Sequence, residues 1–175
     1  MASNMLAVAP VLDTIIGKYL TGNSDYSKFL GKNGSALHEE IEGLDTPNYH
    51  FVELGCGMAK VSRYINTKYQ WKDVVGVEGE LVVLTFARLR NFISKKKIRL
   101  VRANLFKIAI PEKSVVYCYL TTPMMDKLYK DGRLFGKLVI SLSFQITGIQ
   151  PTEKLTIIGF QQRVLVYDLR KVQKL

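Results

Sequence analysis

From residue 49 onward, the chain alternates short, continuously apolar runs with segments of helical periodicity. The apolar runs have the length of buried strands, and we predict strands at 49–54, 73–77, 98–102, 114–120 and 137–144. Apolar residues at helical spacing predict helices between them: one that carries Val61, Tyr64 and Ile65, a strongly apolar one at 80–94, and one at 123–130 that ends near Gly132. Strands that alternate with helices form a parallel sheet whose faces are covered.

The C-terminal part of the chain has a different pattern. Two β-rich runs, 154–160 and 163–169, are separated only by Gln161 and Gln162. No helix fits between them, so we predict an antiparallel hairpin. The expected fold class is therefore α/β: a Rossmann-like, doubly wound, mostly parallel seven-stranded sheet with a C-terminal antiparallel hairpin.

The first 48 residues are expected to be a helical cap or lid, followed by one domain over residues 49–175. Residues 10–20 have an amphipathic pattern, with Pro10 in the first turn of the predicted helix. Further short helices are predicted at 25–30 and 36–41, within a stretch that carries many turn-forming residues. The length of 175 residues suits one domain of ordinary size.

A formal net charge of +10 narrows the choice of partners without naming one. It favours an anionic partner, which would be nucleic acid, an acidic protein or an anionic membrane face. Basic residues cluster at 95–99 and 170–174. Such a run is usually a solvated surface, and its functional interpretation is a binding surface for RNA or an acidic protein. No stretch approaches the roughly 20 apolar residues that span a bilayer, so the sequence leaves only peripheral membrane contact open.

The remaining composition indicates a reduced, metal-free protein. Cys56 and Cys118 lie in apolar or glycine-rich segments and make no disulfide framework, so we expect reduced thiols and a cytoplasmic location. The N-terminal apolar stretch is interrupted by Asp13 and Lys18 and lacks the marks of a secretory leader. His38 and His50 have no partner at metal-ligand spacing, and we expect His50 to be structural.

A glycine turn follows the first predicted strand, at Glu53-Leu54-Gly55-Cys56-Gly57. Strand, glycine turn and helix form the usual start of a nucleotide-binding fold, and Glu78 follows at about the spacing of a ribose acceptor. A dinucleotide fits poorly, because Lys60 replaces the last glycine and Glu53 would face a pyrophosphate. The same carboxylate suits the cationic methionine end of S-adenosylmethionine. An ordinary tight turn is the alternative interpretation of a lone Gly-x-Gly.

These segments resemble the motifs of the class I methyltransferases. Residues 53–57 resemble the first motif, residues 75–78 the second, and residues 102–106 the stretch whose Asp or Asn meets the adenine amino group. The resemblance implies S-adenosylmethionine as the cofactor. The implied cofactor-binding residues are Glu53, Gly55, Cys56, Gly57, Glu78, Gly79, Asn104, Leu105 and Tyr119.

A narrower resemblance is to the small archaeal protein-lysine methyltransferases and their membrane-anchored mitochondrial relatives. Residues 104–114 are too few for a helix between the third and fourth strands, and 115–121 and 137–144 resemble that group's fourth and fifth strands. The resemblance implies a protein substrate whose lysine amine lies beside Tyr119 and Thr121 as catalytic residues. The chain departs from the family at Met58-Ala59, where an acidic residue and a glycine are usual.

The segment after the fourth strand bears on the substrate class. Methyl transfer from a sulfonium needs alignment more than covalent help. Enzymes that methylate base amines usually carry Asp/Asn-Pro-Pro-aromatic there, whereas this chain has Leu120-Thr121-Thr122-Pro123. We expect Thr122 to cap the next helix, with Pro123 at its first position. An RNA methyltransferase and a non-catalytic relative of the fold remain the alternatives to a protein-lysine methyltransferase.

Overall fold

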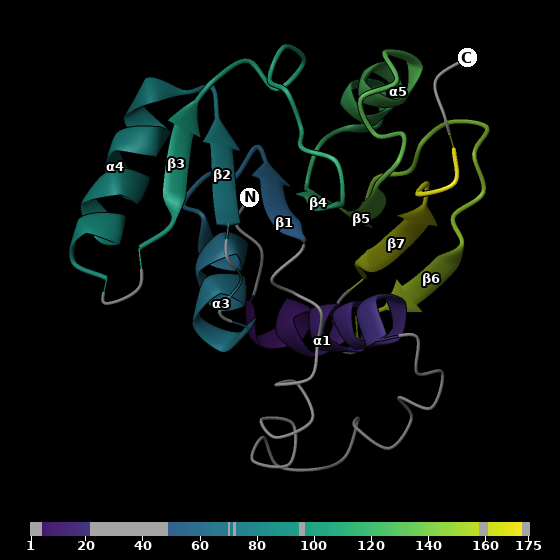
Figure 1. Ribbon diagram of the computed structural model, residues 1–175, viewed down its shortest axis with the longest axis horizontal. Coiled ribbons are helices and arrows are strands. Elements are labelled where there is room, and N and C mark those ends of the chain that lie inside the picture. The colour runs from purple at the N-terminus through teal and green to yellow at the C-terminus, as the bar shows by residue number, and fades with distance from the viewer. Residues whose placement is uncertain are drawn as a thin grey trace.

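The computed structural model describes residues 5–21, 49–69, 71, 73–94, 97–157 and 161–172. Within these residues the strands form one seven-stranded sheet in the order β3-β2-β1-β4-β5-β7-β6 (Figure 1). The strands are β1 (His50–Leu54), β2 (Asp73–Glu78), β3 (Arg99–Arg102), β4 (Ser114–Cys118), β5 (Leu138–Leu142), β6 (Glu153–Thr156) and β7 (Arg163–Asp168). The pairs among β1 to β5 are parallel, whereas β7 pairs antiparallel with both β5 and β6.

Helices cover both faces of this sheet, which explains why its central strands are continuously apolar. The helices are α1 (Met5–Thr21), α3 (Lys60–Tyr69), α4 (Leu81–Phe92) and α5 (Thr122–Lys130). Along β1, Phe51 packs into the core layer that holds α1 and α3. The next residue, Val52, packs into the opposite layer, under α5. Successive side chains of a strand point to opposite faces, so every residue of β4 and β5 is buried.

The predicted fold class is confirmed, with strand ends that differ by a few residues from the expected ones. No helix lies between β3 and β4, in residues 103–113, as the spacing predicted. The connection from β5 to β6, residues 143–152, has no helix either. The terminal hairpin is antiparallel, and the Ile157 N–H donates to the Gln162 carbonyl (3.1 Å). Its first strand ends at Thr156, well before residue 160, and β7 lies inside the sheet between β5 and β6.

The N-terminal helix is longer than the pattern predicted. α1 begins at Met5, so Pro10 lies inside the helix and the expectation of a first-turn proline is wrong. Burial of Val8 extends the helix on the N-terminal side of the proline, and core packing outweighs the local preference for an end there. The predicted helices at 25–30 and 36–41, and His38, lie outside the described residues.

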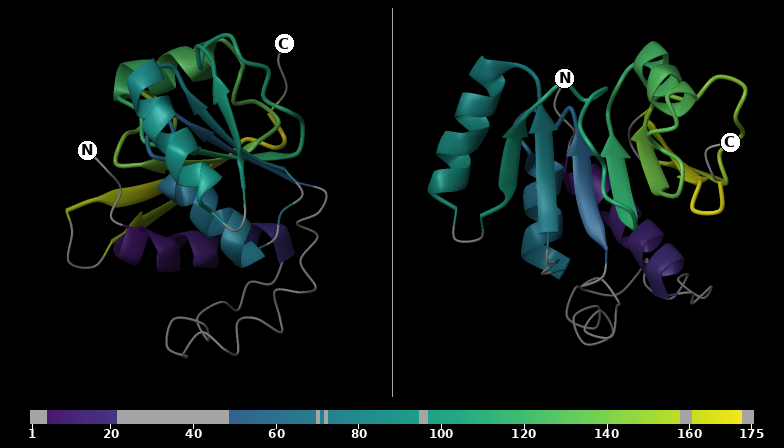
Figure 2. Two further views of the ribbon diagram at one scale, coloured as in Figure 1. Left: turned by 90° about the vertical axis from the view of Figure 1, so that its left-hand side faces the viewer. Right: turned by 45° about the horizontal axis from the view of Figure 1, so that its top comes forward.

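α1 belongs to the core of the domain. Figure 2 shows it across the sheet next to α3. Its Asp13 carboxylate accepts from the Tyr64 hydroxyl (2.8 Å) and pairs with Lys68 on α3. Toward the other end of the helix, Lys18 forms an ion pair with Glu153 on β6 (2.7 Å). The helix therefore joins α3 to the edge of the sheet.

The amino ends of the first three strands are held together through one carboxylate. The Asp73 carboxylate lies 2.9 Å from His50 Nδ1 and 3.0 Å from Arg99 Nη2. Hydrogen bonds from both partners help to hold the pKa of Asp73 below its usual range, against a burial effect that raises it. His50 therefore has a structural role at the end of the sheet away from the glycine turn. Among the described residues, no helix is long and apolar enough to cross a membrane.

Candidate functional site

The carboxyl end of β1 leads into the glycine turn, where the backbone takes left-handed conformations. Gly55, Gly57 and Ala59 have φ values of +67°, +52° and +50°. A side chain at Gly55 would also collide with Leu120, whose Cδ2 would lie 2.8 Å from the added Cβ. Glycine adopts such a φ without penalty, whereas Ala59 does so at a cost of about 1–2 kcal/mol. Ala59, which stands where the class I methyltransferases usually have a glycine, is therefore a strained residue, and it is fully buried.

Glu53 lies below this turn and is only 5% exposed. Its Oε2 accepts hydrogen bonds from the Ser62 backbone N–H (2.8 Å) and the Ser62 hydroxyl (2.6 Å), near the start of α3. Burial raises the pKa of Glu53 to about 7, although the Ser62 hydrogen bonds and the nearby Arg63 oppose the shift. The carboxylate thus anchors the turn to α3, and its predicted place near the methionine end of a cofactor stays a prediction.

Glu78, at the carboxyl end of β2, connects three parts of the site. Its Oε2 accepts from the Gly57 N–H (2.8 Å), and its Oε1 accepts from the Gly79 N–H (2.9 Å) and the Glu80 N–H (3.0 Å). A carboxylate offers about four acceptor positions, so three backbone donors leave room for a further one. Three of the predicted cofactor-binding residues, Gly57, Glu78 and Gly79, are therefore brought together by hydrogen bonds.

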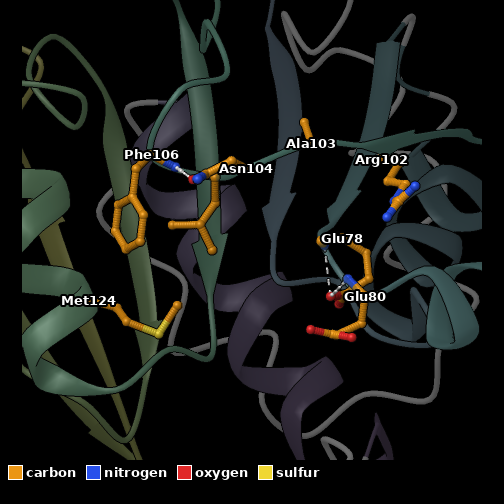
Figure 3. Close-up of a pocket in the computed structure, with 9 residues that line it drawn as sticks. Glu78, Glu80, Arg102, Ala103, Asn104, Phe106 and Met124 are labelled. Atoms are coloured by element: carbon orange, nitrogen blue, oxygen red, sulfur yellow. Dashed lines mark hydrogen bonds between the residues drawn. The ribbon is translucent and has the colours of Figure 1, made fainter.

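An open cleft of about 740 Å³ lies beside Glu78, at the carboxyl ends of β2 and β3. Figure 3 shows the carboxylates of Glu78 and Glu80 on one side of the cleft and the side chains of Phe106 and Met124 on the other. The lining residues are Glu78, Gly79, Glu80, Arg102, Ala103, Asn104, Leu105, Phe106 and Met124. The cleft therefore combines a hydrogen-bond-accepting side with an apolar side that a planar ring can contact.

Asn104 is positioned by a tight turn that follows β3. Its side-chain oxygen accepts from the Phe106 N–H (2.9 Å), and its backbone carbonyl accepts from the Lys107 N–H (2.9 Å). The Ala103 N–H donates to the Glu78 carbonyl (3.2 Å) and fixes this turn against the end of β2. Asn104 and Leu105 thus line the same cleft as Glu78 and Gly79, and their contact with a cofactor there stays a prediction.

The other predicted site residues are not among those that line this cleft: Glu53, Gly55, Cys56, Gly57, Tyr119 and Thr121. Cys56 is buried, its backbone N–H donates to the Val77 carbonyl (2.9 Å), and burial raises the pKa of its thiol. Tyr119, after β4, is half-buried and packs against Phe144, with 5.7 Å between ring centroids. Tyr119 and Thr121 stand at the exit of β4, next to the helix that supplies Met124.

The start of α5 differs by one residue from the expectation. Thr121 is the N-cap, Thr122 is the first helical residue, and Thr121 makes no side-chain cap hydrogen bond. The Thr121 carbonyl accepts from the Met124 and Met125 N–H groups, both at 3.0 Å. Because the cap residue has extended backbone, the helix starts one residue before the expected position, and the exposed Thr121 side chain is not tied to the helix end.

Sequence reasoning missed five of the residues that line the cleft: Glu80, Arg102, Ala103, Phe106 and Met124. Arg102, Ala103 and Phe106 belong to the same 102–106 stretch as Asn104, so the rule that ligands bind at the carboxyl ends of parallel strands could have included them. Met124 comes from the first turn of α5, and only the tertiary arrangement of α5 over β4 brings it to the cleft. No group of three or more metal-ligating side chains gathers anywhere in the described parts of the chain.

Neither a protein-family model nor a curated protein sequence matches this chain. Solved structures do match it. An RNA methyltransferase from Salinibacter ruber in complex with S-adenosyl-L-homocysteine is 18% identical, over 82% of this chain and 97% of that one, with a TM-score of 0.63. The magnesium protoporphyrin IX methyltransferase from Synechocystis PCC 6803, with bound S-adenosylmethionine, is 12% identical over 88% and 95% of the two chains, with a TM-score of 0.53.

A ribosomal protein L11 methylase from Lactobacillus delbrueckii subsp. bulgaricus is 11% identical over 77% of this chain and 79% of that one, with a TM-score of 0.54. These similarities, together with the strand order, show that the fold is that of the class I methyltransferases. The three proteins are named for three different substrate classes, so the fold does not select a substrate.

Proposed function

We propose that this chain is an S-adenosylmethionine-dependent methyltransferase that acts on lysine side chains of a protein. The observation that carries the cofactor assignment is the position of Glu78, which accepts from the glycine turn at 2.8 Å and lines the cleft at the same time. A ribose diol would donate to this carboxylate, and Asn104 would face the adenine edge. The bound cofactor supplies a methyl group activated by a sulfonium.

The charge of the site favours this cofactor over a dinucleotide. Glu78 and Glu80 both line the cleft, and Glu53 lies buried below the glycine turn. A pyrophosphate on this turn would meet like charges at short range. An ammonium and a sulfonium would instead meet opposite charges, and binding a cation would draw Glu53 toward its ionised form.

The surroundings of the methyl group support an amine on a long, flexible side chain. Thr121 is exposed beside Met124, and the segment Leu120-Thr121-Thr122-Pro123 has no side-chain amide, carboxylate or aromatic ring of the kind that holds a base. The connection from β5 to β6, residues 143–152, contains no helix that could cover the site. A side chain that projects from a bulky protein could therefore reach the methyl group, with Tyr119 and Thr121 positioning its amine.

RNA is the second candidate substrate. The net charge of +10 and the place of Arg102 on the cleft favour it, and one structural neighbour is named as an RNA methyltransferase. The test is incubation of the protein with a cell extract and a cofactor labelled on its methyl group. Label that survives RNase, is lost with protease and is recovered as methyllysine supports the proposal.

The other outcomes of this experiment have distinct meanings. Label that is lost with RNase assigns RNA as the substrate. Binding of cofactor with no label transferred to either fraction indicates a non-catalytic relative of the fold. Absence of cofactor binding would refute the cofactor assignment itself.

A further inference from the structure

The outward surface of α4 is apolar, although the helix lies at the edge of the sheet. Val82, Phe86, Leu89 and Ile93 follow one another at intervals of four and three residues, which places them on one side of a helix. Phe86 is 57% exposed, Leu89 63% and Ile93 77%. The opposite side of the helix supplies the contact with the sheet through Leu84 and Ala87, which are fully buried. The helix thus has two apolar sides, and only one of them is used by the fold.

One polar residue on this outward face has its hydroxyl hydrogen-bonded within the helix. Thr85 lies on it, but its hydroxyl donates to the Leu81 carbonyl within the helix (2.8 Å). A hydroxyl bonded in this way has its one donor satisfied inside the helix. The rings of Phe86 and Phe92 are both exposed on α4, and Figure 1 shows α4 as the outermost helix, beside β3. Apolar surface gathered on one helix marks an interaction site.

Basic residues border this surface. Arg88 and Arg90 are exposed and stand one residue to either side of Leu89, so at about 100° per residue they flank the apolar face. Beyond the helix end, Lys97 Nζ lies 5.4 Å from the centroid of the Phe92 ring. Asn91 holds this basic segment to the helix, because its side chain bonds the Ile98 carbonyl (2.9 Å) and the Ile98 N–H (3.1 Å).

We propose that the outward face of α4 binds the surface of an anionic lipid bilayer. A helix with aromatic and aliphatic side chains on one face and arginine and lysine along its borders lies in the interface plane of such a membrane. Each basic residue near the surface adds attraction to anionic headgroups. A second copy of the chain would fit less well, because two such faces would bring their basic borders together.

This binding would place the cleft next to the membrane. Glu80, which lines the cleft, is the residue that caps α4, and the apolar face begins directly after it. A target protein held at the same bilayer surface would therefore meet the cleft at short range. The membrane contact itself does not depend on the methyltransferase proposal, since it uses none of the residues that line the cleft.

Vesicle flotation with the full chain tests the proposal. We expect the protein to float with vesicles of phosphatidylcholine and phosphatidylglycerol, and to float weakly with phosphatidylcholine alone. The double variants Phe86→Ser with Leu89→Ser, and Arg88→Gln with Arg90→Gln, should each lower the vesicle partition coefficient at least about tenfold. Their circular dichroism and melting temperature should be unchanged, because all four side chains are exposed.

A matched control separates this site from general charge attraction. Arg163→Gln with Lys171→Gln removes the same charge from exposed positions at the other side of the sheet and should keep vesicle binding. An equal loss in this control, or vesicle binding that both α4 variants retain, would overturn the proposal. Sedimentation equilibrium tests whether the face binds a second copy of the chain instead. A dimer that dissociates in the Phe86→Ser, Leu89→Ser variant would assign the face to that second copy.

Discussion

Replacing Glu78 with glutamine removes one charge from the centre of the cleft while keeping the shape of the side chain. The carboxylate accepts three backbone N–H groups, from Gly57, Gly79 and Glu80, at 2.8, 2.9 and 3.0 Å. A glutamine has one acceptor oxygen, and its NH₂ group would face at least one of these donors. Glu78→Gln therefore removes the charge of the proposed ribose acceptor and weakens the link between the glycine turn and β2.

The size of the effect follows from the charge of the acceptor. Hydrogen bonds to charged groups contribute about 1.5–3 kcal/mol, and every 1.4 kcal/mol corresponds to about tenfold in affinity. Glu78→Gln should therefore weaken the binding of S-adenosylhomocysteine by roughly 10- to 150-fold. Titration calorimetry at fixed pH measures this change. The matched control is Glu112→Gln, which removes the same charge from an exposed position between β3 and β4 and should leave affinity unchanged.

A melting curve of the ligand-free variant separates the two roles of Glu78. Loss of affinity with a nearly unchanged melting temperature indicates direct contact with the ligand. Affinity equal to that of the unaltered protein, in a variant that remains folded, would remove Glu78 from the site and refute the reasoning about the ribose.

Three further changes test other parts of the structure by denaturant unfolding. The pKa of Glu53 is raised from near 4.5 to about 7, so its contribution to stability is complete below pH 4.5 and is lost as pH rises through 7. The unfolding free energy should fall over this pH window by on the order of 3 kcal/mol. A flat pH profile, equal to that of Glu53→Gln, would contradict the raised pKa. Ala59→Gly removes a buried methyl group but relieves the strain of a φ of +50°, so it should not lower the unfolding free energy. A clear loss of stability would show that position 59 is unstrained. Leu12→Ala should cost about 2–5 kcal/mol, since Leu12 is fully buried against the sheet, whereas a negligible cost would mean that α1 lies outside the core.

Most of the sheet could be predicted from the sequence because its strands are buried on both faces. Such strands appear as continuous apolar runs. The end of the first run at Leu54 showed where the glycine turn begins, and the end of the second run showed that Glu78 follows a strand. The hairpin was also predictable, since two β-rich runs with two residues between them leave no room for a helix. Strand ends were less certain because apolar residues continue past the last paired residue, as at Tyr119 and Leu120.

The features that sequence reasoning missed depend on tertiary contacts. A strongly apolar helix over 80–94 predicts burial, yet its hydrophobic residues are divided between a face on the sheet and a face toward solvent. Periodicity cannot distinguish these two faces when both are apolar. In the same way, Pro10 suggested a helix start because the burial of Val8 before it cannot be known from local pattern.

A crystal structure with S-adenosylhomocysteine tests the central claim most directly. We predict that the ribose hydroxyls lie within hydrogen-bond distance of the Glu78 carboxylate, with the adenine beside Asn104 and between the acidic and apolar sides of the cleft. The methionine end should follow the glycine turn above Glu53. A ligand bound elsewhere, or an empty cleft at ligand concentrations that saturate other proteins of this fold, would contradict the assignment.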